Sequence, residues 1–351
     1  MRDNSILIAM SGGVDSAVAA HLAAQGREAA GVTMRLASEG IGSAEAAQSD
    51  ITGAAAVCDL LGIPHYVAEL GEAFRQTVVK YFIEAYEGGL TPNPCVFCNR
   101  VIKFGALLDF ATDKGYSKIA TGHYARLESS PSGRRLLRRA ADIGKDQTYV
   151  LWSLTQEALT RAEFPLGELS KAEAREIADS LSFPMAHKKD SQDICFVPDG
   201  DYAAFIARIT GRTPEPGDYI SREGAVLGRH KGQLHYTIGQ RKGLGIALGK
   251  PAFVTAKSAI NNTVTLGENA DLFTTRLIAK NPNLIPFDKL DSPMRLLAKV
   301  RYRQEASPAR VEQTGDNTLI VEFEAPQRAI CPGQSLVLYE DDYVVGGGII
   351  C

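Results

Sequence analysis

One stretch near the amino terminus constrains the fold more than any other. The apolar run Ile6 to Met10 is followed by the Ser-Gly-Gly-Val-Asp-Ser turn of residues 11–16 and then by an Ala-rich segment with helical spacing. A strand that leads through a glycine loop into a helix places unpaired backbone N–H groups at the helix start, where they favour an anion. The stretch therefore predicts a phosphate-binding loop in an α/β fold.

Two common kinds of phosphate loop do not fit. A Walker A loop carries a Lys-Ser/Thr pair after its second glycine, a dinucleotide loop reads G-x-G-x-x-G, and residues 11–16 match neither. They instead resemble the pyrophosphate loop of the N-type ATP pyrophosphatases, a resemblance that implies cleavage of ATP to AMP and pyrophosphate with adenylation of a substrate oxygen. The alternative is a glycine turn in which Asp15 and Ser16 only cap a helix.

The chain up to residue 205 alternates apolar strand-like runs with helical patterns, which is typical of a parallel sheet covered by helices. Further strands are predicted at residues 29–34, 65–68 and 118–121, and further helices at 44–61, 72–86 and 170–181. Because ligands of open α/β sheets bind at the carboxyl ends of strands, we expect Ser11, Met34 and Gly122 to lie near one another.

Beyond residue 205 the composition changes to frequent Gly and Pro and short β-branched runs. Late strands are predicted at residues 297–302, 318–323, 335–339 and 344–350. We predict an α/β protein of three domains: a parallel-sheet N-type ATP pyrophosphatase domain (adenine nucleotide α-hydrolase-like) over 1–205, a small central domain over 206–275, and a C-terminal antiparallel β-barrel over 276–351.

Composition restricts the class of protein further. The hydrophobic fraction of 45% and the charged fraction of 23% are those of an ordinary soluble globular chain. The apolar run before the loop is too short for a signal peptide and no run approaches a membrane span, so we expect a cytoplasmic protein without a membrane partner. The net charge of −3 argues against a broadly nucleic-acid-coating protein. Residues 206–273 nevertheless carry nine Lys and Arg against five Asp and Glu, which suits either a docked polyanion or a solvated surface.

Three of the six cysteines stand in polar segments and need an explanation. Cys95 and Cys98 form a C-x-x-C after Thr91-Pro92-Asn93-Pro94, which we expect to be an irregular loop, and Cys195 follows a polar turn. A structural zinc site would need two ligands beyond this C-x-x-C. A thioredoxin-like redox pair is expected at the start of a helix after a first strand, whereas this pair follows a proline-rich loop. Sulfur transfer through a persulfide suits the nucleophilicity of thiolate, whose pKa the neighbouring Arg100 and Lys103 would lower. An adenylating loop favours this third interpretation.

Over its whole length, the chain resembles the bacterial tRNA-specific 2-thiouridylase (MnmA) family. Eight ordered motifs carry the resemblance, at residues 9–16, 91–104, 120–124, 145–147, 190–196, 237–244, 301–304 and 332–334. The resemblance implies a tRNA-uridine 2-sulfurtransferase, which adenylates O2 of the wobble uridine and transfers persulfide sulfur to C2, releasing AMP and pyrophosphate. It implies ATP with Mg²⁺, a tRNA anticodon stem–loop gripped partly by the central domain, and a sulfur donor such as a cysteine desulfurase or sulfur relay protein.

The resemblance also implies residue roles. Cys98 would be the catalytic nucleophile and Cys195 the catalytic persulfide carrier, and the two would form a disulfide at one stage. The ATP-binding residues would be Ala9, Met10, Ser11, Gly12, Gly13, Val14, Asp15, Ser16, Met34 and Gly122. Asn93, Pro94 and Cys95 would meet the target base, and tRNA contacts would come from His123, Lys145, Asp146, Gln147, Arg301, Tyr302 and Gln334.

Cys95 departs from the family pattern, because some members carry an acid/base Asp there. Either Cys95 replaces the carboxylate as a thiol acid/base, or Cys95, Cys98 and Cys195 together ligate an iron–sulfur cluster, and we rank direct persulfide chemistry first. The arginines of residues 134–139 are interpreted equally as a phosphate patch or a solvated hairpin. Cys58, Cys331 and Cys351 are interpreted as small hydrophobic residues. An amidating ligase of the same loop class and a non-catalytic RNA- or zinc-binding module remain the alternatives.

Overall fold

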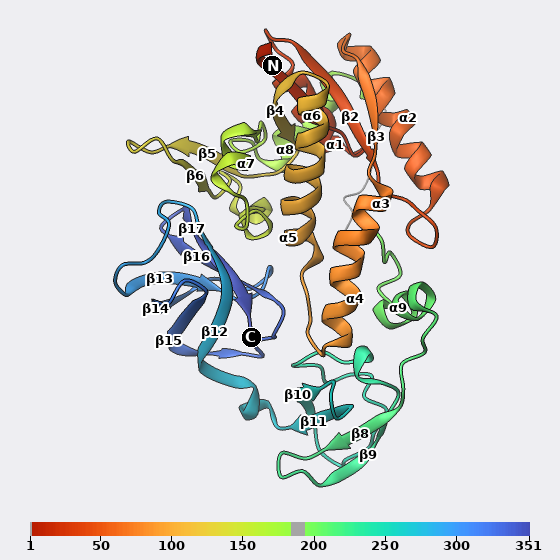
Figure 1. Ribbon diagram of the computed structural model, residues 1–351, viewed down its shortest axis with the longest axis vertical. Helices are drawn as coiled ribbons and strands as arrows, with labels where there is room; N and C mark the ends of the chain where they lie inside the picture. The colour runs from red at the N-terminus through yellow and green to blue at the C-terminus, as the bar shows by residue number, and fades with distance from the viewer. Residues whose placement is uncertain (1, 184–193) are drawn as a thin grey trace.

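The computed structural model describes residues 2–183 and 194–351, arranged as an α/β domain, a small β-rich domain and a β-barrel (Figure 1). The sheet of the first domain has the order β3-β2-β1-β4-β7, and every neighbouring pair is parallel. The strands are β1 (Arg2–Ala9), β2 (Ala29–Arg35), β3 (His65–Glu69), β4 (Tyr116–Thr121) and β7 (Ala162–Glu163). The chain order reverses between β1 and β4, which makes their carboxyl ends the expected ligand site.

Helices cover both faces of this sheet because alternate side chains of β1 point in opposite directions. Ile6 and Ile8 pack with α1 (Val14–Ala23), α2 (Ala44–Leu61) and α8 (Lys171–Ser180). Leu7 and Ala9 pack on the other face, with α6 (Leu107–Asp113) and α7 (Gln156–Arg161). The predicted helix 44–61 is confirmed, with Gly62 ending it at φ 65°.

Two long helical segments run side by side from the sheet toward the central domain (Figure 1). The first comprises α3 (Gly71–Phe74), the π-helical η1 (Arg75–Val79) and α4 (Lys80–Glu87). The second, which we call the cysteine helix, comprises α5 (Pro94–Cys98), the π-helical η2 (Asn99–Ala106) and α6. The rings of Tyr81 and Phe97 lie 4.7 Å apart between the two segments. The rings of Phe82, Phe196 and Phe205 continue this contact toward α9 (Tyr202–Thr210).

The central domain is a sheet of order β10-β11-β8-β9 around buried tyrosines at 219 and 236. Its strands are β8 (Gly217–Ile220), β9 (Val226–His230), β10 (Phe253–Ser258) and β11 (Thr263–Gly267).

Short 3-10 turns connect larger elements elsewhere in the chain as well as in this domain. They lie at η3 (Ile143–Lys145), η4 (Thr148–Val150), η5 (Gln233–His235) and η6 (Asn269–Leu272).

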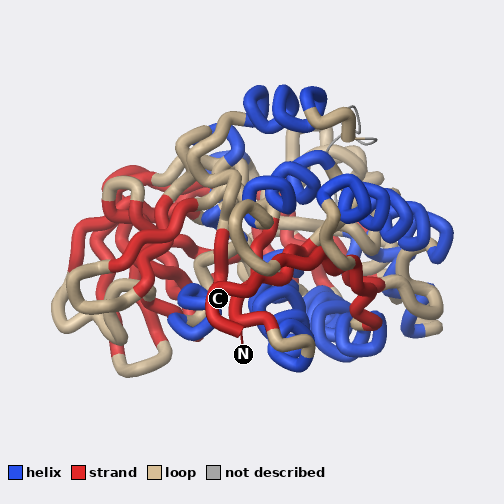
Figure 2. The backbone as a smooth tube through the Cα atoms, turned by 90° about the horizontal axis from the view of Figure 1, so that it is seen from above, coloured by secondary structure: helices blue, strands red, loops and turns tan. Residues whose placement is uncertain are grey.

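The C-terminal strands form an antiparallel barrel that closes where β12 pairs with β17. They are β12 (Phe273–Leu284), β13 (Met294–Lys299), β14 (Ser307–Thr314), β15 (Thr318–Arg328), β16 (Ser335–Glu340) and β17 (Tyr343–Ile350). Figure 2 shows these strands gathered to one side of the helix-rich domain. The predicted fold class is confirmed. The predicted boundaries at 205/206 and 275/276 fall within α9 and β12, and they stay predictions.

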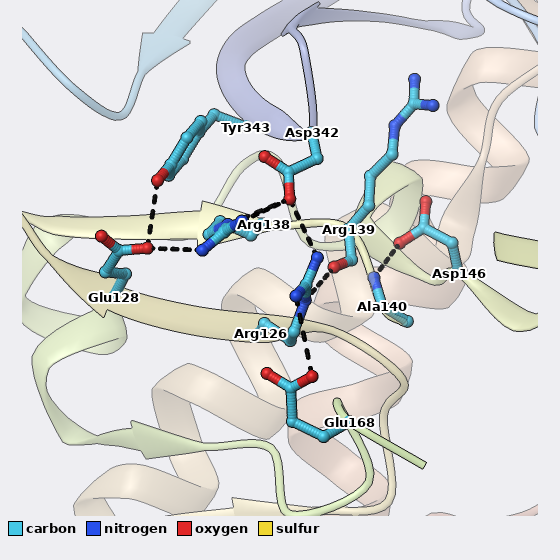
Figure 3. Close-up of polar contacts among 9 residues, drawn as sticks. All are labelled: Arg126, Glu128, Arg138, Arg139, Ala140, Asp146, Glu168, Asp342 and Tyr343. Carbon is cyan, nitrogen blue, oxygen red and sulfur yellow. Dashed lines mark hydrogen bonds and ion pairs between the residues drawn. The ribbon is translucent and has the colours of Figure 1, made fainter. Parts of the chain in front are cut away.

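The predicted arginine cluster fastens the first domain to the barrel. The hairpin β5 (Arg126–Ser129) and β6 (Arg135–Arg138) lies beside β17, with Tyr343 opposite Arg138. Arg126 and Arg138 both donate to Asp342 Oδ2, at 2.9 and 2.7 Å (Figure 3). The predicted hairpin is present, but its arginines are partly buried rather than freely solvated, and the phosphate-patch interpretation stays a prediction.

Within the described ranges, 2–183 and 194–351, the structure contains no helix of the length and apolar character that a bilayer crossing requires. The cytoplasmic location stays a prediction.

Replacing Asp342 by Asn tests the hairpin junction. Asp342→Asn removes the charge that two partly buried arginines share, so we expect a loss of about 1–2 kcal/mol in the free energy of unfolding, measured by calorimetry. Glu312→Gln is the matched control, because Glu312 forms an exposed pair with Arg310 on the barrel surface and its removal should leave the melting temperature unchanged. Equal melting temperatures for both variants would show that the junction does not depend on Asp342.

Candidate active site

Residues 11–16, the phosphate loop, are held in a conformation that requires glycine. Gly12 has φ +66°, and a Cβ there would stand 2.9 Å from Asp50 Cα. Ser16 Oγ donates to Gly13 O at 2.9 Å and accepts from Ser11 N at 3.2 Å. Gly13 is the cap residue directly before α1, and it supplies no side-chain cap to the helix start. The first-turn N–H groups of α1 therefore suit an anionic ligand.

The Asp15 carboxylate of the loop is held by two residues that the sequence did not single out for it. Lys171 Nζ lies 2.7 and 2.9 Å from its two oxygens, and Tyr124 OH donates to Oδ1 at 2.9 Å. Lys171 is only 8% exposed, whereas the Asp15 side chain is 31% exposed, so this ion pair is only partly shielded from water. Lys171 follows the capping residue Ser170 of α8 and has no motif of its own; Tyr124 ends the motif 120–124.

The predicted ATP residues gather at one edge of the sheet. A Cβ on Gly122 would stand 2.9 Å from Asp15 C and Ser16 N, so the end of β4 lies directly against the start of α1. Met34 lies near the end of β2, and Met10 is buried with Sδ 3.6 Å from Cys58 Sγ. Ala9 and Val14 flank the loop at its two ends. That these residues bind ATP stays a prediction.

The irregular loop expected before the C-x-x-C is present at residues 91–93, but it ends one residue earlier than predicted. Pro94 is the first residue of α5, and Asn93 caps this helix by accepting from Cys95 N at 3.2 Å. Proline fits the first helical position because its missing N–H would be unpaired there, and asparagine is a preferred cap. Cys95 and Cys98 therefore lie on a helical first turn, which also removes the loop objection to a redox pair.

The described cysteines are all free thiols, and three of them lie close enough to influence one another. Cys95 and Cys195 are exposed and Cys98 is half-buried. Burial raises the pKa of Cys98 to about 12, with smaller upward effects from Cys195 and Cys95 and an opposing effect from Lys103. Surrounding protein likewise raises the pKa of Cys95 and Cys195, and Lys103 opposes both shifts. Lys103 is therefore the cation that favours each of the three thiolates.

Behind Lys103 lies a buried histidine that connects the cysteine helix to β4. His123 Nε2 is 3.4 Å from Lys103 Nζ, and His123 Nδ1 is 2.6 Å from Thr121 Oγ1. Burial, aided by the charge of Lys103, holds the pKa of His123 well below its ordinary value, so the ring is neutral. With 7% of its surface exposed, His123 is placed to position Lys103, whereas its predicted contact with tRNA stays a prediction.

Several other predicted tRNA residues form bonds within the protein. The Asp146 carboxylate accepts from Ala140 N and from Thr148 N and Oγ1, and Gln147 Oε1 accepts from Tyr124 N. Arg301 Nη2 donates to Ala329 O at 2.6 Å and contacts Cys331 Sγ at 2.9 Å. Tyr302 is 42% exposed and Lys145 is partly exposed, so these two remain accessible to a ligand.

The segment that leads into the cysteine helix is held by both other domains. Gln334 Nε2 donates to Thr91 O at 2.9 Å, and Thr91 N donates to Pro332 O at 2.8 Å. On the other side, Gln233 Nε2 donates to Tyr86 O at 3.0 Å at the end of α4. The barrel and the central domain thus position Asn93 and the cysteines behind it.

An iron–sulfur cluster is not supported. Across residues 2–183 and 194–351, no three His, Cys, Asp or Glu side chains form a group that could hold a metal ion. The hypothesis that Cys95, Cys98 and Cys195 are joint ligands is therefore not supported by the described residues. The expectation that Cys351 is a small hydrophobic residue is corrected, because Cys351 is exposed. Residues 190–193 of the motif that contains Cys195 lie outside the described residues.

The fold and the site together define a nucleotide-binding α/β protein with clustered thiols. Residues 4–199 match a family model described as "tRNA methyl transferase HUP domain". Residues 203–268 match "tRNA methyl transferase PRC-barrel domain", and residues 274–350 match "Aminomethyltransferase beta-barrel domain".

Curated relatives match nearly the whole chain. Proteins named tRNA-specific 2-thiouridylase MnmA from Lachnoclostridium phytofermentans and Clostridioides difficile are 45% and 46% identical over 98% and 99% of this chain and 99% and 98% of their own. "tRNA-specific 2-thiouridylase MnmA 1" from Caldanaerobacter subterraneus is 46% identical over 99% of this chain and 98% of its own. The chain belongs to the tRNA-specific 2-thiouridylase family, as its motifs predicted.

Removing the Lys103 charge tests its influence on the thiols. Because Lys103 lowers the pKa of Cys95 and Cys195, Lys103→Gln should raise both, so that less thiolate is present at a given pH below the pKa. We expect alkylation by iodoacetamide at about pH 8 to slow by roughly 3- to 10-fold, measured for each cysteine peptide by mass spectrometry.

Arg100→Gln is the control, because Arg100 is an exposed cation on the same helical segment. Its alkylation rates should equal those of the wild type. Equal slowing in both variants would mean that general positive charge, rather than Lys103, sets thiol reactivity.

Proposed function

We propose that the protein thiolates C2 of the wobble uridine of tRNA in an ATP-dependent reaction. The observation that carries the proposal is that the phosphate loop and the thiol cluster converge on one short segment, Gly122-His123-Tyr124. Gly122 contacts the loop backbone, Tyr124 holds Asp15 of the loop, and His123 contacts Lys103 beside the thiols. Relatives that cover the chain end to end carry the matching name.

The first step activates the base. The N–H groups at the start of α1 bind the phosphates of ATP, and the O2 of uridine attacks the α-phosphate so that pyrophosphate leaves. Mg²⁺, when bound here, would neutralise the charge of the leaving pyrophosphate. Asp15 is the carboxylate in the loop that suits the ion, and Lys171 adds a fixed positive charge beside it. The adenylated oxygen becomes a good leaving group.

The second step transfers sulfur. The exposed Cys195 receives a persulfide from a donor such as a cysteine desulfurase or a relay protein, and its terminal sulfur attacks C2 while AMP departs with the former O2. The Cys98 thiolate then attacks Cys195 Sγ, which frees 2-thiouridine and leaves a Cys98–Cys195 disulfide. An external thiol reduces that disulfide and completes the cycle. Cys95 lies beside both cysteines as a candidate proton donor.

The tRNA must present its target base unstacked. Flipping a base from its stack costs roughly a few kcal/mol, which contacts to the anticodon stem–loop must offset. Exposed Tyr302 and partly exposed Lys145 supply such contacts in this proposal, and Asn93 and Pro94 meet the base at the start of the cysteine helix. His123, Asp146, Gln147, Arg301 and Gln334 act mainly by holding these elements in place.

The proposed chemistry is tested by assaying 2-thiouridine under anaerobic conditions with ATP, Mg²⁺, unmodified tRNA and a donor of sulfane sulfur, a cysteine desulfurase with cysteine, because sulfide alone cannot form the Cys195 persulfide. Cys98→Ser and Cys195→Ser should each lower product formation by more than about 100-fold, because each removes a nucleophile of the cycle. Cys351→Ser is the matched control, since Cys351 is also exposed but lies at the end of the barrel. Full activity of Cys98→Ser and Cys195→Ser would contradict the proposal. So would pyrophosphate release that depends on a small molecule being amidated instead of on tRNA.

Lys171 offers a separate test of the ATP site. Lys171→Gln leaves the Asp15 carboxylate uncompensated beside the incoming phosphates, so we expect ATP affinity to fall about tenfold, measured by isothermal titration calorimetry. Arg175→Gln on the exposed face of the same helix should bind ATP as the wild type does. An unchanged affinity for Lys171→Gln would remove the Asp15–Lys171 pair from the ATP site.

A further inference from the structure

Two cations and three tyrosines form a cluster between the hairpin β5–β6 and the barrel. The Arg139 guanidinium lies over the Tyr339 ring, with Cζ 4.1 Å from its centroid. Lys299 Nζ, at the end of β13, is 5.7 Å from the Tyr149 ring and 5.8 Å from the Tyr302 ring. The Tyr149 and Tyr302 rings are themselves 5.8 Å apart. We call these five residues the cationic–aromatic cluster.

The backbone of Arg139 is fixed, while no acid within residues 2–183 and 194–351 forms an ion pair with its guanidinium. Arg139 N donates to Asp342 O at 2.8 Å, and Arg139 O accepts from Arg126 Nε at 2.6 Å. Asp342 already pairs with Arg126 and Arg138, and Figure 3 shows the Arg139 guanidinium pointing away from that network. In the part of the chain that the structure describes, the buried Nε of Arg139 has no hydrogen-bond partner.

Lys299 is in a similar position. No carboxylate within residues 2–183 and 194–351 forms an ion pair with Lys299 or Arg139. Asp146 is the carboxylate whose charge acts on Lys299, where it favours the protonated form. Its oxygens already accept hydrogen bonds from Ala140 and Thr148. Burial lowers the pKa of Lys299 despite Asp146, and the charge of Arg139 adds to the effect. The two cations therefore repel each other in a partly desolvated place.

Such an arrangement is unfavourable unless something offsets it. Cation–π contacts explain why each cation stacks on a tyrosine, but they leave the buried Arg139 Nε without a hydrogen-bond partner among the described residues and do not remove the effect of Arg139 on Lys299. An anionic ligand would remove the repulsion and satisfy the unpaired Arg139 Nε. Burial raises the pKa of Tyr302, and the charges of Asp146 and of the Cys95 thiolate add to the shift, so Cys95 lies within electrostatic reach of the cluster.

We infer that the cationic–aromatic cluster is a subsite for one nucleotide of RNA adjacent to the target base. Arg139 and Lys299 bind its backbone phosphate, and the exposed Tyr302 ring stacks on its base. A phosphate beside an aromatic ring is the combination with which proteins grip single-stranded nucleic acid. The inference rests on the proposed function and adds Arg139 and Lys299 to its RNA-binding residues.

The test measures binding of an unmodified anticodon stem–loop RNA between about 50 and 200 mM KCl. Each of Arg139→Gln and Lys299→Gln should weaken binding about 3- to 10-fold and reduce the slope of log K against log [KCl] by about 0.7, the value for one phosphate contact in a single strand. Affinity for ATP should be unchanged in both. Lys299→Arg keeps the charge and should retain the wild-type slope.

Lys280→Gln is the control, because Lys280 is an exposed lysine elsewhere on the barrel; it should bind the RNA as the wild type does. If Arg139→Gln fails to fold because its hairpin docks on the barrel, Lys299→Gln alone decides. Wild-type affinity and slope for Lys299→Gln, with RNA still bound by the wild type, would overturn the subsite and leave the proposed function intact. Failure of the wild type to bind the RNA would overturn both.

Discussion

The backbone of Gly122 lies so close to the start of α1 that no other residue fits: a Cβ there would be 2.9 Å from Asp15 C and Ser16 N. This approach brings the end of β4 against the phosphate loop at the point where the order of the sheet reverses. The next two residues then reach in different directions. His123 contacts Lys103 on the cysteine helix, and Tyr124 donates to Asp15. The phosphate loop and the thiols are consequently both positioned by the segment Gly122-His123-Tyr124.

The other two domains complete that support rather than merely adding binding surface. The barrel holds Thr91 through Gln334 and Pro332, and the central domain holds the end of α4 through Gln233. The cysteine helix therefore begins where three domains meet. A barrel displaced from this contact would move Asn93, and with it the first turn that carries Cys95 and Cys98. This coupling explains in physical terms why motifs far apart in the sequence belong to one site.

The sequence predicted what local patterns determine. Helix 44–61 with its left-handed Gly62, the Ser170–Glu173 capping box and the phosphate loop all depend on neighbouring residues, and the structure contains each of them. Of the two prolines before Cys95, Pro92 lies in the predicted loop, but Pro94 with an Asn cap starts a helix. The Asp15–Lys171 pair joins residues 156 positions apart, which no local pattern reports. Motif positions such as Asp146 and Gln334 were predicted from family resemblance to touch tRNA, but a motif does not reveal whether its side chain faces a ligand or the protein.

The central claim is that ATP turns O2 of the uridine into a leaving group that sulfur then displaces. The most direct test uses tRNA whose target uridine carries ¹⁸O at O2, incubated with ATP and the persulfide donor, a cysteine desulfurase with cysteine, for a single turnover. The account predicts that the label appears in the phosphate of AMP, in an amount equal to the 2-thiouridine formed. Unlabelled AMP in the presence of 2-thiouridine would contradict it, because the oxygen would then have left without being adenylated.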